Sequence, residues 1–348
     1  STFYGTSFVF QNVSSNSTSF VGITDAAISS AASGSVTIKG GISSNVTGLT
    51  ANSTYYVQDD GSISSPTVSA PYVIVGATYV QNFSVTAQET SPTGVAFNTD
   101  GTKMFVVGYD GDDVNEYALS TGFDVSTSVF TDSFSVAAQE IIPTGLAFNT
   151  DGTKMFVVGR AGTASVHEYT LSTGFDVSTA SYVDSFSVSS QDTTPTGIAF
   201  NTDGTKMFIA GQQGADVNEY ALSTGFDVST ASFTDSFSVS GQDIYPEGVA
   251  FNTDGTKMFV VGNEGNDVNE YTLSTGFDVS TSTFVDAFSV SAQDTGPSGV
   301  AFNTTGGNMF VVGLANAAVY EYSTGVGSVT TVLAGKALSS TSINLDYT

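Results

Sequence analysis

The fifteen-residue stretch Gly94–Gly108, GVAFNTDGTKMFVVG, decides the fold of this chain. Its two flanks, Val95–Phe97 and Met104–Val107, are rich in the aromatic and β-branched residues that strands favour. Residues 98–103 (NTDGTK) lie between them and carry turn chemistry, because Asn and Asp bond their own backbone and Gly adopts a positive φ. The stretch therefore predicts a β-hairpin, which is marginal alone and needs neighbours on both faces.

The same stretch occurs five times along the chain, with variants that begin at Gly145, Gly197, Gly248 and Gly299. All five methionines occupy one repeat position, at intervals of 51, 52, 51 and 51 residues. A period near 50 residues that is rich in short strands is typical of propeller blades of about four strands each. In the first copy we expect strands at residues 94–98, 103–108, 114–119 and 132–136.

The phase of the repeats predicts how the ring closes. A strand of the fourth type, Tyr79–Val85, precedes the first copy, whereas the last copy departs from the pattern after its third strand. An N-terminal strand can therefore complete the fifth blade and hide the edges that an open array would expose. We predict an all-β fold in which a five-bladed β-propeller, residues 77–324, is inserted into a small discontinuous β domain made of residues 1–76 and 325–348. A single helical turn is expected at residues 26–32.

Composition excludes several classes of partner. The chain has 33 acidic residues against seven Lys plus Arg, which gives a net charge of −26. Nucleic acid and anionic membrane surfaces both need a basic face, so neither is an expected partner. The sequence has no apolar run of the ~18 residues that a transmembrane helix needs, and the absence of cysteine excludes thiol catalysis. The acidity fits solubility in a salty medium, with acidic Ca²⁺-binding loops as the alternative.

Two segments outside the repeats carry a family resemblance. Residues 48–61 are GLTANSTYYVQDDG and residues 334–341 are AGKALSST. Together they resemble a module, GLT…YYVQ.DG…GKALS.T, that is common in tail-fibre and other appendage proteins of bacteriophages, although here the propeller separates its two halves. The resemblance implies a virion or extracellular protein that assembles with itself and with other virion or filament proteins.

The blades have a resemblance of their own. The strand-turn unit is similar to NHL-type and YVTN-type propeller repeats, with Asn-Thr-Asp-Gly in place of their Pro-Asp-Gly. This similarity supports the fold and says little about function, because propellers host enzymes and binders alike.

The copies differ from one another chiefly in two sets of loops. One set joins the second and third strands of a blade, and the other joins the fourth strand to the first strand of the next blade. A four-stranded meander places both sets on one face, and loops on a rigid scaffold are where recognition is built. We therefore predict a ligand-binding face, with sequence drift at unconstrained positions as the alternative. The candidate binding residues are Tyr109, Asp110, Asp112, Arg160, Gln212, Gln213, Tyr245, Asn263 and Glu264.

Other candidates for chemistry have structural interpretations. His167 is the only histidine, and without a Gly-x-Ser-x-Gly motif it indicates no catalytic triad. The aspartates of the hairpin turns are expected to satisfy backbone groups; they are Asp100, Asp151, Asp203 and Asp254. Five glutamines that each precede an acidic residue are expected to bond the backbone of a neighbouring blade; they are Gln88, Gln139, Gln191, Gln242 and Gln293.

A metal site has only fragmentary support. Asp110, Asp112 and Asp113 resemble part of a Ca²⁺ loop but lack the full Asp-x-Asp-x-Asp-Gly…Glu spacing. We expect no cofactor, with Ca²⁺ at these aspartates as the alternative.

The sequence thus predicts a non-enzymatic protein. The first hypothesis is a structural or adhesive protein of a phage virion, as a tail fibre, appendage or surface decoration, whose propeller faces outward to bind a host surface or glycan. The second is a secreted microbial filament protein or adhesin. The third is a propeller-type glycan-active enzyme, for which no catalytic set can be located.

Overall fold

The structure is a computed structural model. It describes residues 72–324 together with short strands on either side, at residues 23–24, 36–37, 42–43, 54–57, 63–64, 333–339 and 342–345. The chain divides into two compact units, residues 70–325 and residues 1–69 with 326–348. The helical turn expected at residues 26–32 lies outside the described residues.

Strands from both ends of the chain share one sheet in the smaller unit. Its order is β3–β27–β26–β4–β5, and β4 pairs antiparallel with β26. A separate pair joins β1 to β2. The bounds are β1 Ile23–Thr24, β2 Val36–Thr37, β3 Ile42–Ser43, β4 Thr54–Val57, β5 Ile63–Ser64, β26 Leu333–Ser339 and β27 Ser342–Leu345.

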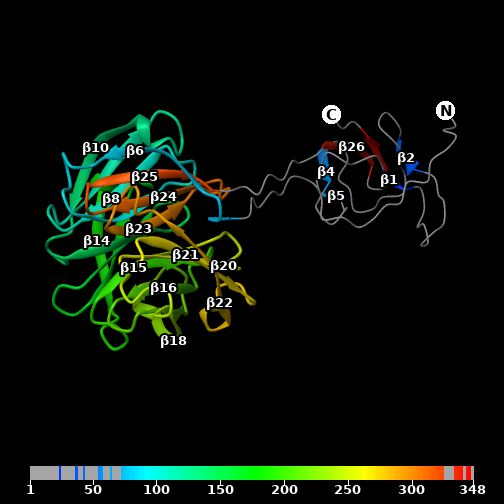
Figure 1. The fold of residues 1–348 in the computed structure, drawn as a ribbon. Coiled ribbons are helices and arrows are strands. Elements are labelled where there is room, and N and C mark those ends of the chain that lie inside the picture. The colour runs from blue at the N-terminus through cyan, green and yellow to red at the C-terminus, as the bar shows by residue number, and fades with distance from the viewer. Residues whose placement is uncertain are drawn as a thin grey trace. The chain divides into compact units, whose positions relative to one another are not determined.

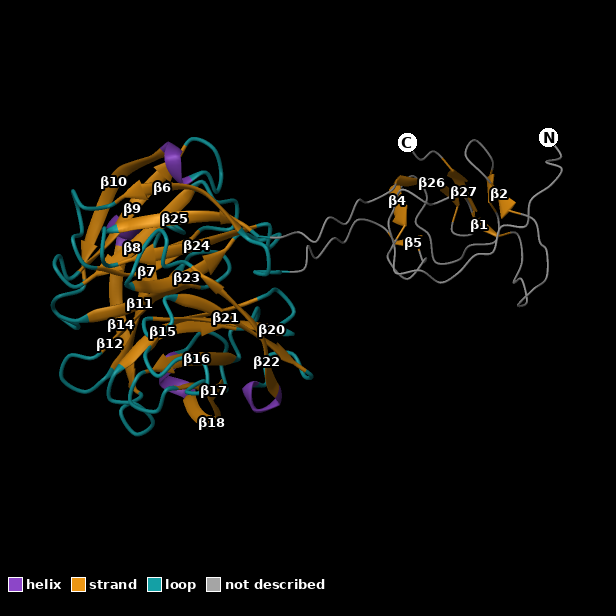
Figure 2. Ribbon diagram, viewed as in Figure 1, coloured by secondary structure: helices purple, strands orange, loops and turns teal. Residues whose placement is uncertain are grey.

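Five four-stranded antiparallel sheets form the five-bladed propeller that the repeat period predicts (Figures 1 and 2). The first blade holds β7 (Pro92–Phe97), β8 (Lys103–Gly108), β9 (Asp113–Leu119) and β10 (Ser128–Ser135). The second holds β11 (Pro143–Phe148), β12 (Lys154–Gly159), β13 (Ser165–Leu171) and β14 (Ala180–Ser187). The third holds β15 (Pro195–Phe200), β16 (Lys206–Gly211), β17 (Asp216–Leu222) and β18 (Ala231–Ser238). The fourth holds β19 (Pro246–Phe251), β20 (Lys257–Gly262), β21 (Asp267–Leu273) and β22 (Ser282–Ser289).

The fifth blade is completed by an N-terminal strand, as predicted. It holds β23 (Pro297–Phe302), β24 (Asn308–Gly313) and β25 (Ala318–Ser323), and its outer strand is β6 (Thr78–Ser84). Figure 1 shows β6 beside β25, and the two pair antiparallel with Ser323 opposite Thr78. The ring therefore closes through hydrogen bonds between segments about 240 residues apart.

A single 3₁₀ turn precedes the outer strand in the first four blades. These turns are η2 (Val125–Thr127), η3 (Val177–Thr179), η4 (Val228–Thr230) and η5 (Val279–Thr281). No helix among the described residues has the length and apolar character needed to cross a membrane.

Five glycines let the innermost strands approach one another around the axis. A Cβ added to Gly197 would lie 2.7 Å from the Cα of Gly248 in the next blade. At the other four positions the added Cβ would lie 3.0–3.2 Å from the Cα of the equivalent glycine in the next blade. These positions are Gly94, Gly145, Gly248 and Gly299. A side chain at this position would therefore force the inner strands apart.

An ion pair between a partly exposed lysine and a buried glutamate holds each of the first four blades to the next, and we call it the latch. In the third blade, Lys206 Nζ lies 2.7 Å from Glu219 Oε1 and also donates to the carbonyl of Phe277 in the fourth blade. The other Glu219 oxygen accepts from Val279 N–H of the fourth blade at 3.0 Å. The remaining pairs are Lys103–Glu116, Lys154–Glu168 and Lys257–Glu270. Because the glutamates are buried, each latch satisfies a charge that would otherwise be costly to bury.

The latch changes at the two contacts of the fifth blade. Lys257 and Glu270 of the fourth blade bond the backbone of Tyr72 and Ile74, which stand where the other blades have their Phe-Asp-Val turn. In the fifth blade, Asn308 replaces the lysine and bonds Glu321 at 2.8 Å. Gln81 of β6 donates to the same glutamate at 2.9 Å. The N-terminal segment therefore supplies part of the polar network that closes the ring.

The structure confirms one prediction about polar side chains and corrects another. Asp100 Oδ1 accepts from the backbone N–H of Thr102, as expected for a hairpin turn, and the three equivalent aspartates do the same. The prediction for the glutamines was wrong. Gln88 accepts from the hydroxyl of Tyr117 at 3.5 Å, and its four counterparts likewise accept from buried tyrosines. The tyrosine hydroxyl needs a partner because its ring is buried in the blade.

We expect Gly197→Ala to destabilise the propeller by about 1–3 kcal/mol, because its Cβ would overlap the neighbouring backbone. The matched control is Gly241→Ala, at an exposed position where an added Cβ meets nothing within 4 Å. Chemical denaturation of both variants measures the difference. Equal stability of the two variants would contradict the close approach of the strands.

We expect Lys206→Met to destabilise the propeller by roughly 3–5 kcal/mol, because it leaves the buried Glu219 charge without its partner. The double variant Lys206→Met/Glu219→Gln should recover part of this loss, because a neutral amide still accepts from Val279 N–H. Thermal unfolding compares the two, and a double variant less stable than the single one would argue against the latch.

Candidate ligand site on the propeller axis

The two variable sets of loops meet on one face of the propeller, as predicted, and we call it the loop face. In the first blade the N–H of Tyr109 donates to the carbonyl of Ser91, and the equivalent bond recurs in the other four blades. A buried acid in each blade fixes both loops from below. Asp243, for example, accepts from the N–H of Tyr245 at 2.6 Å and from that of Glu264 at 3.2 Å. Its counterparts are Glu89, Glu140, Asp192 and Asp294. The loops are therefore held in place before any ligand arrives.

The chain enters and leaves the propeller on the opposite face. Tyr72 OH bonds the carbonyl of Asn303, in the turn between β23 and β24. Thr324 N–H donates to the carbonyl of Gly307 in the same turn. The loop face is therefore the face away from the two ends of the propeller.

A ring of hydroxyls ties the inner strands together near the loop face. Thr93 Oγ1 donates to the carbonyl of Pro143 in the next blade at 2.9 Å. Thr144, Thr196 and Ser298 make the same bond to their own neighbours, at 2.8–2.9 Å. These four residues form the hydroxyl ring, and each bond joins two adjacent blades.

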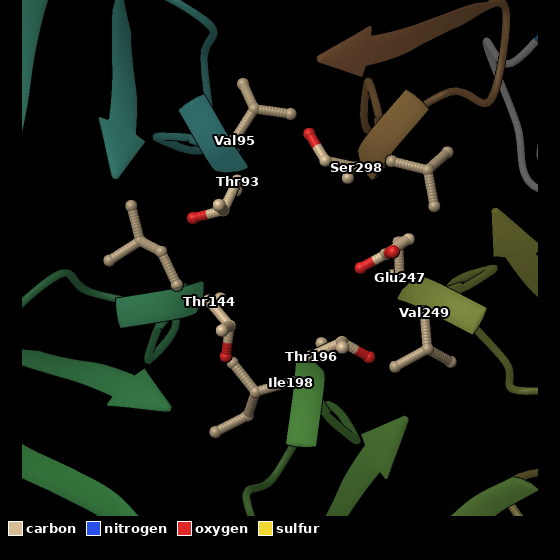
Figure 3. A pocket seen from close by; sticks show the side chains of 15 residues that line it. Thr93, Val95, Thr144, Thr196, Ile198, Glu247, Val249 and Ser298 are labelled. Atoms are coloured by element: carbon tan, nitrogen blue, oxygen red, sulfur yellow. The ribbon is translucent and has the colours of Figure 1, made fainter. Parts of the chain in front are cut away.

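Glu247 interrupts the hydroxyl ring in the fourth blade. It occupies the repeat position that holds Thr or Ser elsewhere, so no hydroxyl joins the fourth blade to the fifth there. Figure 3 shows Thr93, Thr144, Thr196, Glu247 and Ser298 around one opening, with the Glu247 carboxylate directed into it. The opening is a narrow cavity of about 20 Å³, which is room for about one water molecule.

The environment of Glu247 favours its neutral form more than water does. Burial raises the pKa of its carboxyl to about 7, although nearby Arg160 and hydrogen bonds from Gln212 and Asn263 act in the opposite direction. Gln212 Nε2 donates to Glu247 Oε1 at 2.8 Å. Glu247 can therefore accept or donate a hydrogen bond at neutral pH.

Four predicted residues gather around Glu247. Tyr109, Arg160, Gln212 and Asn263 hold the first position of their loops, and we call these four the axial rim. Arg160 Nη2 donates to the hydroxyl of Tyr109 at 2.6 Å, and the guanidinium carbon lies 5.2 Å from the Tyr109 ring centroid. Burial raises the pKa of Tyr109, against the opposing effect of Arg160. The axial rim thus brings together side chains from the first four blades.

Three other predicted residues, Asp110, Gln213 and Glu264, bond the loop that precedes the first strand of their blade and not Glu247. Asp110 accepts from Thr90 and Ser91, Gln213 accepts from Thr193 N–H at 3.0 Å, and Glu264 accepts from Ile244 N–H at 3.2 Å. The side chain of Tyr245 is 51% exposed. The side chain at the second position of these loops therefore bonds the adjacent loop of the same face, whereas the side chain at the first position faces the axis.

The three aspartates of the suspected Ca²⁺ loop share no common partner. Asp113 accepts from Asn115 Nδ2 at 2.8 Å, while Asp112 has a positive φ of 48°. Within residues 72–324 and the flanking strands that the structure describes, no three His, Cys, Asp or Glu side chains form a group that could hold a metal. His167 lies elsewhere, with its Nε2 3.7 Å from Oε2 of buried Glu140.

Sequence reasoning missed Glu247, although the signal was present. The residue after the repeated proline is Thr, Thr, Thr, Glu and Ser in the five copies, so one copy departs from a hydroxyl. The binding residues were predicted in the loops because the loops differ in length and charge from one copy to the next. This position lies in a strand, where a single change is easily taken for drift.

Comparison with known proteins identifies no family for this chain. No protein-family model matches the chain, and no curated protein matches it. Among solved structures, a functionally unknown protein from Desulfotomaculum acetoxidans is 13% identical with a TM-score of 0.41, and the match covers 64% of this chain and 62% of that one. A luciferin-regenerating enzyme is 12% identical with a TM-score of 0.46, over 70% of this chain and 95% of that one. The periplasmic gluconolactonase of Pseudomonas aeruginosa is 14% identical with a TM-score of 0.40, over 74% and 71%. At such identities and TM-scores these likenesses support no conclusion about function.

We expect Glu247→Thr to stabilise the propeller by about 1 kcal/mol, because threonine completes the hydroxyl ring. The gain should grow with pH. The folded-state pKa of Glu247, about 7, lies above its ordinary value of 4.5, so its contribution to stability is complete below about pH 4.5 and is lost as pH rises through about 7. Threonine does not titrate in this range.

Denaturant unfolding of Glu247→Thr between pH 4 and pH 8 measures both effects. The control is Glu247→Gln, which removes the titration without supplying a hydroxyl and should flatten the pH dependence only. A Glu247→Thr variant less stable than the native protein at pH 8 would contradict the role of the ring.

Proposed function

We propose that the protein is a non-catalytic structural or adhesive protein whose propeller binds a glycan at the axial rim. The observation that carries the proposal is Glu247, which stands where every other blade has a ring hydroxyl. Departures from a stabilising local rule are expected at functional sites. Here the departure lies beneath the diversified loops.

The chemistry of the rim suits a polyhydroxylated ligand. Gln212 and Asn263 offer planar amides that both donate and accept, and Glu247 offers a carboxyl group. Tyr109 adds an aromatic ring with a hydroxyl. Because the axial cavity holds about one water molecule, an organic ligand would lie across the rim and reach Glu247 from above.

The position of the site supports a display role. The loop face lies away from both ends of the propeller, so it stays open when those ends are tethered. Together with the sequence resemblance to phage appendage modules, this supports a tail fibre, appendage or surface decoration on a virion, with self-assembly through the smaller unit. A secreted microbial adhesin would use the same geometry.

An enzymatic function has less support. Glycoside hydrolysis ordinarily uses two carboxyl groups that flank the scissile bond. Glu247 is the one carboxylic acid among the residues that line the axial cavity. The site therefore offers recognition without a matched acid and base.

We expect the full chain to bind a subset of an immobilised glycan panel, and Gln212→Ala to weaken that binding about tenfold, because Gln212 contacts both the ligand and Glu247. The matched control is Gln213→Ala, next in sequence but bonded to Thr193 in the loop between β14 and β15. Equal loss in both variants, or no glycan-binding activity in the panel, would contradict a glycan site on the rim.

A further inference from the structure

Four of the five Lys and Arg side chains in residues 72–324 form the ion pairs of the latches. Each of these four lysines lies 2.6–2.7 Å from a buried glutamate, and three of the four latches also bond a neighbouring phenylalanine carbonyl. Arg160 is the one cationic Lys or Arg side chain in residues 72–324 that makes no ion pair. Among residues 72–324, a negatively charged ligand can therefore pair with a free Lys or Arg side chain only at Arg160, on the axial rim.

Arg160 is held in place for such a partner. Its Nη2 donates to Tyr109 OH, and its guanidinium lies beside the Tyr109 ring. A guanidinium has five N–H donors in a fixed fork, and this contact uses only one side of it. The remaining donors match the two oxygens of a carboxylate.

We propose that the ligand is a sugar bearing a single carboxylate, such as a hexuronic acid, with that carboxylate on Arg160 and its hydroxyls on Glu247, Gln212 and Asn263. The inference rests on the proposed glycan-binding function and adds the class of sugar. The rim supplies one charged fork, from the second blade, and hydrogen-bonding groups from the third and fourth blades.

The charge balance favours one carboxylate over a phosphate or several acids. The chain carries a net charge of −26, and the rim has one arginine to set against it. A phosphate near −2 or a run of acidic sugars would bring more negative charge than Arg160 offsets, with Glu247 close by. A single carboxylate is matched by a single guanidinium.

The test compares three monosaccharides of one stereochemistry on the full chain: a hexuronic acid, its methyl ester and the parent hexose. Titration calorimetry should show the acid binding about tenfold tighter than the ester and the hexose, because only the acid makes a charge-assisted pair. Arg160→Gln should erase this preference, so that the acid, the ester and the hexose bind the variant with similar affinity. Because Gln is the residue at the same loop position in the third blade, this variant retains a side chain that the scaffold already accepts.

Each result separates the inference from the proposed function. Equal affinity for acid and hexose, with binding still dependent on Gln212, would overturn the carboxylate assignment and leave the glycan site standing. Tighter binding of a sugar phosphate than of the hexuronic acid would also overturn it. Failure of all three sugars and of the wider glycan panel would remove both proposals. Arg160→Lys, which keeps the charge but loses the fork, should retain only part of the preference.

Discussion

The close approach of five glycines around the axis is the constraint on which this structure depends. Because Gly197 and its counterparts carry no Cβ, the inner strands come near enough for Thr93, Thr144, Thr196 and Ser298 to bond the next blade directly. The same closeness leaves an axial cavity for about one water molecule. A propeller packed this tightly has no room for an organic ligand inside it, so the ligand that we propose would have to lie on the rim.

Farther from the axis the blades diverge, and larger groups fill the space between them. Buried aromatic side chains pack across each boundary, as Phe105 does against Phe148 with ring centroids 4.5 Å apart. The Lys–Glu latches lie in this wider zone and give four of the five boundaries a specific register, because Lys and Glu each contact backbone beyond their own blade, as Lys103 and Glu116 do. Hydrophobic packing tolerates sliding more readily than such paired bonds do. The latches and the hydroxyl ring therefore fix the blades at two radii.

Much of the fold could be predicted from sequence because the same strand and turn pattern recurs in every copy, so that each copy supports the assignment of the others. The hairpin of Gly94–Gly108, seen five times, leaves little doubt about strand order, and the N-terminal Tyr79–Val85 strand reveals the closure. The candidate site could be predicted only in part. Sequence locates a loop but not the direction of its side chains. Gln212 and Gln213 were therefore predicted as equivalent, although Gln212 bonds Glu247 and Gln213 bonds Thr193 of the adjacent loop. The partner of Gln88 was missed for the same reason.

The asymmetry of the rim is the strongest argument that this face recognises something. The five blades share their buried acids and the first four share their hairpin turns and latches, and a purely structural ring would gain from sharing Thr at position 247 as well. Instead, four blades contribute Tyr109, Arg160, Gln212 and Asn263, and the fourth also places Glu247 beneath them. A symmetric rim would meet a ligand in five equivalent orientations. A rim with one cation and one acid on different blades accepts an asymmetric ligand in a single orientation, which is what selective recognition requires.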